Sequence, residues 1–416
     1  MTLRLLLPFS LRKDFPALDS ATCYLDNAAT THKPQAVIDT FTRTYSQDYA
    51  PIYRGLYPQA EAMTERYEGV RSEIAAWLGA AKSSEIVLTY GATDGMHAFI
   101  SSWARPTIKA GDEIVFTELD HHMVVSSCRA LAAERGALIK LISVRDQTCA
   151  LEVNPQLLQQ VITSRTRMVV IPLSSNIRGP LLDQEIDAIV HAARAVGAVV
   201  VGDASQVPAH QSLSRIFSRW KPDALIWSGH KSFGPSGVGV LYIAEALHDQ
   251  LVPYQYGGGM IHAMAPDSMS WRAMPRMLEA GTRPIEAVLG LGAAIRYIQK
   301  HIDYDLVQRH EAQLVTAVVE GLSSIPGLSI LGDLAVLKAQ GHMVTFVVAG
   351  IHAHDIALYL ADEGIAVRAG DHCCQPLHDK LGLVTGSVRI SFACYNTIDE
   401  ARKVAAAVRN AVACLR

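Results

Sequence analysis

The residues of clearest chemical use stand at the ends of two apolar runs. The run Ala224–Trp227 is followed by Ser-Gly-His and then by Lys231, and the run Ala198–Gly202 is followed by Asp203. If both runs are strands of one sheet, the amine and the carboxylate face a common edge. Pyridoxal phosphate (PLP) needs such a pair, because a lysine forms its Schiff base and a carboxylate keeps its ring nitrogen protonated. A surface lysine at a strand end is the alternative, and the neighbouring residues decide between the two.

A phosphate-binding turn is predicted at Gly91–Gly95, between a predicted strand and a predicted helix. Free backbone N–H groups at such a turn, here from Ala92 onward, can hold a phosphate, and Thr93 adds a hydroxyl. Ser228 and His230, next to the lysine, supply two more donors. Glycine-rich turns are common and most bind nothing, so the second donor set carries most of the weight.

Further polar residues follow other predicted strands. Asp203 either pairs with a pyridine nitrogen or is the N-cap of a helix that begins at Ala204-Ser205. Gln206 and Asn176 are candidates for contact with the ring hydroxyl, or are ordinary turn residues. His121 could stack on a flat ring and move a proton. His121 and His122 form an adjacent pair whose side chains point apart, and no third ligand is suitably spaced, so we expect no metal.

An arginine and a cysteine complete the candidate set. Arg389 lies in an apolar predicted strand and needs a partner, either a substrate carboxylate or an internal salt bridge. Cys373 is predicted to be exposed on a polar loop, where His372 or Arg368 would favour its thiolate. Cysteines are more often small buried hydrophobes, and Cys373-Cys374 could be a redox pair. The polar, glycine-containing loop favours a nucleophile.

Composition excludes several classes of protein. The chain has 416 residues, half of them hydrophobic, a formal charge of −3 and a pI near 6.6. That length favours two domains, and the balanced charge argues against nucleic acid as a partner. No apolar run is long enough to cross a membrane, and Leu3–Leu7 is expected to be a short lead-in that packs on the protein. Seven cysteines without metal-like spacing indicate free thiols in a reducing, cytoplasmic compartment.

The elements that must position these residues follow from hydrophobic patterning. Alternating apolar runs and helical stretches from about residue 82 to 241 predict an α/β unit with a mainly parallel sheet and a site at its strand ends. Strands are expected at Glu85–Thr89, Glu113–Thr117, Met168–Pro172, Ala198–Gly202, Ala224–Trp227 and Gly237–Ile243. An α+β pattern follows, with strands expected at Met343–Val348, Ile365–Arg368 and Ser387–Phe392. Helices are expected at Asp183–Val196, Ile285–His301, His354–Glu363 and Ile398–Leu415. We therefore expect an N-terminal segment (1–24) that packs on the small domain, a large domain (25–290) and a small C-terminal domain (291–416) that carries the cysteine loop.

With these residues assembled, the chain resembles the class V aminotransferase-like PLP enzymes of fold type I, and within them the cysteine desulfurases of the SufS/CsdA type. The resemblance runs through almost the whole length. It rests on the segments Tyr24–Thr30, Arg54-Gly55, Ser228–Lys231 with Gly234–Gly237, Glu279–Thr282, Arg368–Cys373 and Tyr395–Thr397. Two departures stand out. Ala92 occupies a position where the family usually has threonine, and Asp371 adds negative charge beside the thiol, which should raise the pKa of Cys373.

The resemblance also implies a role for each candidate residue. For the cofactor, these are Lys231 for the Schiff base, Asp203 for the ring nitrogen, Gln206 and Asn176 near the ring hydroxyl, His121 stacked on the ring, and Ala92, Thr93, Ser228 and His230 at the phosphate. Thr282 would reach that phosphate from the other subunit of a homodimer. For the substrate, Arg389, Asn176 and Arg368 would hold the carboxylate, and Cys373 would accept the sulfur.

The implied reaction converts L-cysteine to L-alanine and leaves a persulfide on Cys373. A sulfur-acceptor protein of the SufE/CsdE type and a role in iron–sulfur cluster or related biosynthesis are implied with it. The alternatives are another class V aminotransferase or a selenocysteine lyase-like enzyme, and a non-catalytic paralogue that serves as a sulfur-transfer partner. An aminotransferase has no need of an exposed thiol at residue 373.

Overall fold

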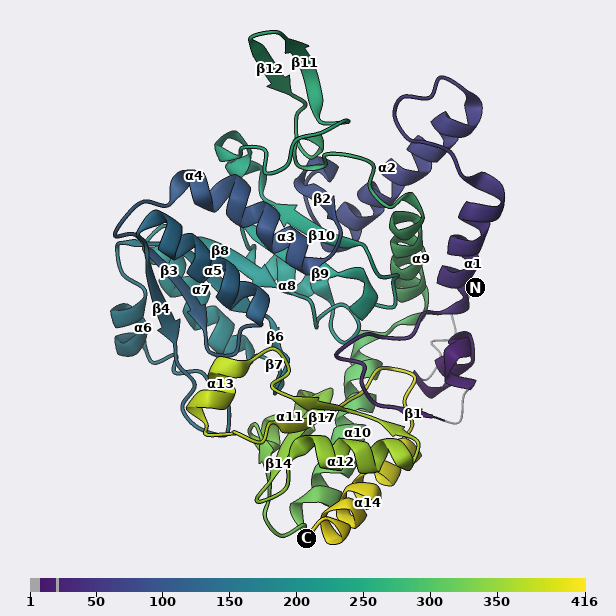
Figure 1. Cartoon of the computed structure of the whole chain (residues 1–416), viewed down its shortest axis with the longest axis vertical. Helices are drawn as coiled ribbons and strands as arrows, with labels where there is room; N and C mark the ends of the chain where they lie inside the picture. The colour runs from purple at the N-terminus through teal and green to yellow at the C-terminus, as the bar shows by residue number, and fades with distance from the viewer. Residues whose placement is uncertain (1–7, 20–21) are drawn as a thin grey trace.

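A seven-stranded sheet forms the centre of the molecule (Figure 1). The computed structural model describes residues 8–19 and 22–416, so the predicted lead-in Leu3–Leu7 lies outside the described residues. In spatial order the strands are β2 (Ile86–Thr89), β10 (Gly239–Ile243), β9 (Ala224–Ser228), β8 (Val199–Asp203), β5 (Thr166–Pro172), β3 (Glu113–Thr117) and β4 (Leu138–Ile142). Only β10 runs antiparallel to its neighbours in this sheet. The predicted mainly parallel sheet is therefore confirmed.

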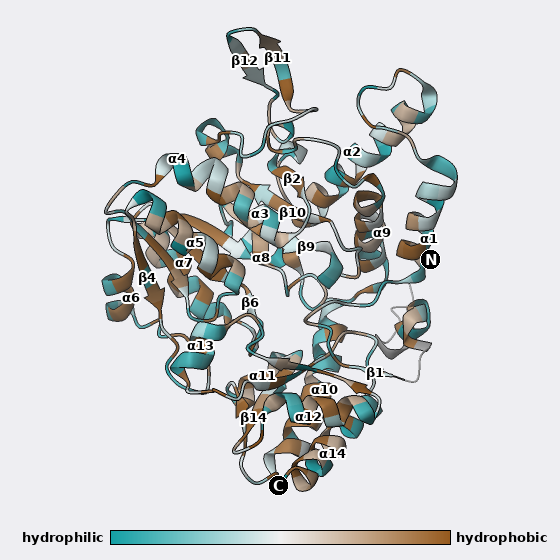
Figure 2. Cartoon of the chain, in the orientation of Figure 1, coloured by the Kyte–Doolittle hydropathy of each residue, from teal (hydrophilic) through white to brown (hydrophobic). Residues whose placement is uncertain are grey.

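Both faces of this sheet are buried, which explains why its strands are almost continuously apolar. Along β3, Val115 packs into the core on one face, whereas Ile114 and Phe116 pack into the core on the other. The first face is covered by α2 (Pro58–Leu78), α7 (Asp183–Ala195), α8 (Leu213–Trp220) and α9 (Ile285–His301). The second is covered by α3 (Ala92–Phe99) and α5 (His122–Arg135). Figure 2 shows hydrophobic residues concentrated in α9 and in the strands of this sheet.

A second, four-stranded antiparallel sheet lies in the C-terminal part of the chain. Its order is β13 (Leu328–Leu331), β14 (Met343–Val348), β17 (Ser387–Ser391) and β16 (Arg368–Gly370). Its core is shared with α10 (Tyr304–Ser323), α12 (Ala353–Asp362) and α14 (Ile398–Cys414). The smaller helices along the chain are α1 (Gln35–Arg43), α4 (Arg105–Thr107), α6 (Pro155–Val161), α11 (Leu334–Gln340) and α13 (Gln375–Lys380). The expected smaller α+β unit is thus present.

The N-terminal segment contacts both parts of the molecule. Phe15 packs against Phe233 of the large-sheet unit and against Tyr395 of the C-terminal part. The short strand β1 (Cys23–Tyr24) pairs in parallel with β15 (Ile365–Ala366). The division at residues 24 and 290 stays a prediction, and residue 290 lies within the unbroken helix α9.

Several elements were not expected from the sequence. The strands β4 and β13, which lie at the edges of their sheets, were not among the predicted strands although their sequences are apolar. The ribbon of β6 (Ser174–Ser175) with β7 (Gly179–Pro180) is too short and too polar to stand out. The hairpin of β11 (Ile261–Ala265) and β12 (Ser268–Trp271) has almost no buried face and projects away from the rest of the molecule (Figure 1). The predicted strand 365–368 divides into β15 and β16, which join different sheets. Among the helices of the described residues, none has the length and apolar character to span a bilayer.

Candidate active site

Six strands of the large sheet end at one edge, and residues at or after the ends of five of them line a cavity of about 230 Å³. Strands β2, β3, β5, β8 and β9 run in the same direction, so the residues after their carboxyl ends converge. Twelve predicted residues line this cavity: Ala92, Thr93, His121, Asn176, Asp203, Gln206, Ser228, His230, Lys231, Arg368, Cys373 and Arg389. The sequence-based set therefore forms one site, with Thr282 as the exception.

Lys231 and Asp203 face the same cavity from the ends of neighbouring strands. Burial lowers the pKa of the Lys231 amine, and the negative charge of Asp203 partly offsets that effect. One oxygen of Asp203 accepts a hydrogen bond from the Ser205 N–H at 2.9 Å within a turn. The helix-capping interpretation is wrong, because the next helix, α8, begins only at Leu213. The carboxylate lines the cavity, and its pairing with a pyridine nitrogen stays a prediction. A buried amine and a buried acid on one cavity are what a PLP ring and its aldehyde require.

The turn before α3 is packed closely against β10. A Cβ atom at Gly239 would lie only 2.6 Å from the Cα of Gly91, so only glycine allows this approach. Gly91 has φ +152°, in the region that favours glycine. The Ser228 hydroxyl accepts a hydrogen bond from the Ala92 N–H at 2.8 Å, which joins the turn to the end of β9. The two donor sets expected to hold a phosphate thus form one continuous cradle.

Asn176 connects Gln206, which follows strand β8, to the cysteine loop and to Arg389 of strand β17. Its side-chain oxygen accepts a hydrogen bond from Gln206 at 2.9 Å, and its amide nitrogen donates to the His372 carbonyl at 3.1 Å. Its own carbonyl accepts a bond from Arg389 at 3.1 Å. Gln206 also donates to the carbonyl of Ala28 at 2.7 Å. These bonds fix the amide groups that were expected near a ring hydroxyl.

His121 is held in one neutral form. Its Nδ1 atom accepts a hydrogen bond from the Met123 N–H at 3.0 Å, which leaves the proton on Nε2. Burial first, and then the positive charge of Lys231, lowers the pKa of His121 to about 4. Near neutral pH this imidazole therefore carries no charge and can donate a hydrogen bond from Nε2. His230 is similar, because burial lowers its pKa to about 4.

Arg389 is a buried cation at the boundary of the cavity. It is 1 % exposed, and its Nη2 atom lies 3.5 Å from Oδ1 of Asp26. Arg368 binds the other oxygen of Asp26 at 3.0 Å. Desolvation lowers the pKa of Arg389 to about 10, so it stays charged at neutral pH. The expected salt bridge exists, yet Nε of Arg389 has no hydrogen-bond partner among the described residues, which leaves capacity for an anionic ligand.

The cysteine loop lies over the edge of the large sheet. Cys373 is partly exposed and lines the same cavity as Lys231. Its carbonyl accepts a hydrogen bond from the His122 N–H at 2.8 Å, and the ring of His122 accepts one from the Gln375 N–H at 3.0 Å. Together with the Asn176 bond, these contacts place a thiol and an amine on one cavity.

The structure corrects one expectation about this loop. We expected His372 to favour the thiolate as a nearby cation, but His372 is 5 % exposed and burial holds its pKa well below the ordinary value. A neutral imidazole supplies no such charge. Asp371 uses one carboxylate oxygen to accept a bond from the Cys373 N–H at 3.0 Å. Cys374 is fully buried, with its sulfur 3.8 Å from the carbonyls of Leu119 and Asp120.

Thr282 lies away from this cavity. It lines a second hollow of about 270 Å³ together with Tyr53, Arg54 and Arg276. Beside this hollow, the guanidinium of Arg276 stacks over the ring of Tyr53 at 3.8 Å. Within one chain, therefore, Thr282 does not join the other phosphate candidates.

Asp26 is the main site residue that the sequence did not reveal. It lies in the segment Tyr24–Thr30, which was noted only for its resemblance to the family. An isolated bridge between Asp26 and Ser391 places it beside Arg389. A single acid in a short polar segment belongs to no repeating hydrophobic pattern. The ion pair of Asp26 with Arg389 could therefore be identified only from the fold. The cavity also includes Ser174, Ala28 and Leu119, which carry no pattern of their own.

Comparison with known proteins defines the class. The sequence pattern of the Aminotransferase class-V family matches residues 23–404, and the chain belongs to that family. Cysteine desulfurase CsdA of Escherichia coli is 33 % identical over 97 % of this chain and 98 % of its own length. A crystal structure of CsdA superimposes with a TM-score of 0.90 over 99 % of this chain and all of that chain, at 32 % identity. The apo cysteine desulfurase of Thermococcus onnurineus gives a TM-score of 0.91 at 31 % identity, with full coverage of both chains. Within the class V family, the chain is therefore a member of the cysteine desulfurases, and the predicted fold class is confirmed.

Proposed function

We propose that this protein uses PLP to transfer the sulfur of L-cysteine to Cys373, with L-alanine as the second product. The observation that carries the proposal is the shared cavity, which the Lys231 amine, the Asp203 carboxylate and the Cys373 thiol all line. An aminotransferase would use the first two groups and would have no use for the third. The family membership supports the same choice.

The fit to PLP rests on the groups of this chain. Lys231 would hold the cofactor, Asp203 would pair with its ring nitrogen, and the cradle around Ala92 and Ser228 would receive its phosphate. When bound, PLP supplies an electron sink for the substrate carbons. The lowered pKa of Lys231 lets its amine take up and return a proton once it is free. Arg389, still charged, would bind the substrate carboxylate.

A side chain of the protein, the thiolate of Cys373, accepts the sulfur atom. The Cys373 thiolate attacks the sulfur of the substrate, so that a sulfur–sulfur bond forms while the substrate's carbon–sulfur bond breaks. The electron pair of the broken bond stays with the three-carbon fragment, which takes up a proton and leaves as alanine. The Lys231 amine would return that proton, and His121 would donate a hydrogen bond from Nε2 within the cavity. Cys373 retains one added sulfur atom as a persulfide.

We also propose that two copies of this chain form a homodimer. A second copy of this chain would bring Thr282 and its hollow to the phosphate region, which explains why Thr282 is absent from its own chain's cavity. Exposed Tyr45 and Tyr49, stacked at 5.3 Å, and Leu56, 93 % exposed, give the second copy an apolar surface to cover.

Because the persulfide must be removed to restart the cycle, we also propose a thiol-bearing acceptor protein of the SufE/CsdE type. We propose that the sulfur released in this way is used in iron–sulfur cluster assembly, in a reducing cytoplasm.

The deciding experiment compares Cys373→Ser with the unaltered holoenzyme. With L-cysteine and a thiol reductant, we expect the unaltered holoenzyme to form alanine and sulfide in equal amounts. In Cys373→Ser, the rates at which both products form should fall about a hundredfold or more. The visible absorbance of bound PLP should be the same in both proteins, because Cys373 does not hold the cofactor. Alanine formation that continued at an unchanged rate in Cys373→Ser would contradict the nucleophile role.

A further inference from the structure

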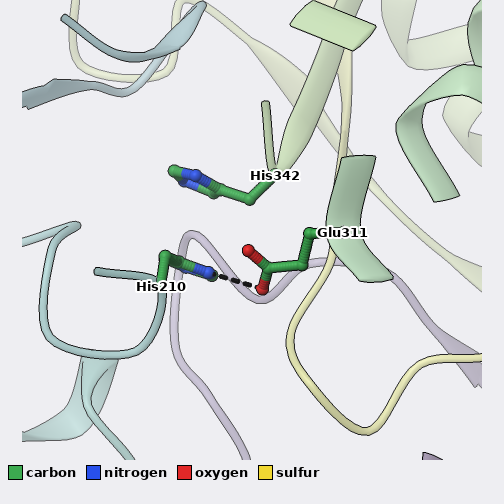
Figure 3. Close-up of side chains that lie close together, drawn as sticks. All are labelled: His210, Glu311 and His342. Atoms are coloured by element: carbon green, nitrogen blue, oxygen red, sulfur yellow. Dashed lines mark hydrogen bonds and ion pairs between the residues drawn. The ribbon is translucent and has the colours of Figure 1, made fainter. Parts of the chain in front are cut away.

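A second cluster of ionisable side chains is made up of buried residues that do not line the cavity (Figure 3). His210 follows β8 of the large sheet, Glu311 lies on α10, and His342 directly precedes β14 of the four-stranded sheet. The three residues are 3 %, 2 % and 1 % exposed. Nδ1 of His210 lies 2.7 Å from Oε1 of Glu311, and the two imidazole rings stack at 3.7 Å with an interplanar angle of 9°. One nitrogen of each histidine and one carboxylate oxygen all lie within 4.8 Å of one another.

His342 is the unusual member of this cluster. Neither of its ring nitrogens has a hydrogen-bond partner among the described residues, although the side chain is almost fully buried. Buried polar atoms are nearly always satisfied, because an unmade hydrogen bond costs roughly 1–3 kcal/mol. Burial, followed by the nearby His210 and Arg389, holds the pKa of His342 well below its ordinary value. It is thus a neutral imidazole with an unused lone pair beside a histidine–carboxylate pair.

We propose that His210, Glu311 and His342 bind one divalent transition-metal ion of the Zn²⁺ type. Two imidazole nitrogens and one carboxylate oxygen are a donor set that such ions accept, with water as a fourth ligand. A structural role alone would account for the bond between His210 and Glu311. It would not account for the placement of a second histidine, without partners, on top of that pair.

The present geometry shows what binding requires. Stacked rings direct their lone pairs into parallel planes, so the His342 ring must turn about its Cβ–Cγ bond to reach an ion held by the other two residues. Zinc–ligand distances of about 2.0–2.2 Å also require the three donor atoms to move closer together than 4.8 Å. The ion takes the place of the hydrogen bond between His210 and Glu311, and the ring proton of His210 moves from Nδ1 to Nε2. His210 lies in the connection that follows β8 of the large sheet, whereas α10 and β14 belong to the C-terminal part, so the ion would link the two parts of the molecule.

Cobalt titration of the holoenzyme tests this site, since tetrahedral Co²⁺ absorbs visibly and substitutes for Zn²⁺. Cys373→Ser, Cys414→Ser and His354→Ala are introduced first, because the partly exposed thiol of Cys373 and the exposed thiol of Cys414 could also bind metal. The surface rings of His352 and His354, 4.9 Å apart, could do the same. We expect a visible cobalt band that saturates at one ion per chain, and a higher melting temperature.

Two further substitutions in that background assign the ligands. His342→Phe keeps a stacked ring on His210 without a donor atom, and Glu311→Gln keeps a hydrogen-bond acceptor without the charge. Each should weaken cobalt binding about tenfold or more, whereas His191→Ala, on the exposed face of α7, should leave it unchanged. No band at one equivalent, or a band that His342→Phe retains, would overturn the proposal. The result does not depend on the proposed desulfurase activity, because binding and melting are measured without substrate.

Discussion

The sheet edge and the cysteine loop hold their reactive groups in different ways. Lys231 and Asp203 follow strands whose positions are set by continuous hydrogen-bonded ladders inside a buried sheet. Cys373 lies on a loop where His372 and Cys373 have positive φ angles of 51° and 60°. Non-glycine residues adopt this conformation at a cost, and only when surrounding contacts maintain it. The amine and the acid are thus fixed by the fold, whereas the thiol is held by a few specific bonds.

This difference suits the two tasks of the proposed reaction. The groups around the cofactor must keep one geometry throughout catalysis, and a buried parallel sheet provides it. The thiol must first reach the substrate sulfur and then present the persulfide to an acceptor. Each hydrogen bond that docks the loop contributes only about 0.5–1.5 kcal/mol, so the loop can change position without disturbing the sheet.

Substitution of Lys231 by alanine should give the largest effect. With no amine at the sheet edge, the cofactor has no covalent anchor and the substrate no proton acceptor. We expect a loss of alanine production of at least about a thousandfold. The absorbance of the lysine-bound cofactor should vanish, while thermal unfolding of the cofactor-free forms should coincide for the variant and the unaltered protein. Alanine production that persisted in Lys231→Ala would mean that this sheet edge is not the site.

Arg389→Lys should have an intermediate effect. Lysine keeps the charge beside Asp26 but loses the planar fork that can bind a carboxylate through two bonds. The loss of one hydrogen bond to a charged group costs about 1.5–3 kcal/mol, which corresponds to roughly 10- to 150-fold in kcat/KM for L-cysteine. Most of this change should appear in KM. An unchanged KM would assign Arg389 to the internal salt bridge alone.

Much of the sheet edge could be predicted, because its signals are local. Buried strands are apolar runs, and a polar residue directly after such a run marks the strand end; β3, β14 and α9 match the predicted bounds. The site residues at these ends converge because parallel strands share one direction, a rule that needs no knowledge of packing. The end of helix α7 could also be predicted from a local signal. Gly197, predicted as its C-terminal cap, follows the helix with a φ of +73°.

The remaining features depend on contacts that sequence spacing does not encode. Asp26 pairs with Arg389 across most of the length of the chain, and no pattern connects the two residues. The charge of His372 was misjudged because burial, which holds its pKa low, follows from the docking of the loop. His210 and Glu311 are 101 residues apart, so their pairing also needed the fold. Sequence patterns thus predict elements and their ends, whereas charge states and long-range pairs require the structure.

His122→Ala should have the smallest effect and tests the docking of the cysteine loop most directly. The substitution removes the ring acceptor of the Gln375 N–H and leaves the backbone bond to the Cys373 carbonyl in place. The loss of one such bond should favour the undocked loop by roughly two- to tenfold. We expect Cys373 to react faster with iodoacetamide by that factor and the rate of alanine formation to fall by a similar factor, while cofactor absorbance is unchanged. His191→Ala, on the surface of α7, provides the control. If both rates stayed at the control values in His122→Ala, the loop would be as firmly held as the sheet edge, and the contrast between the two regions would be lost.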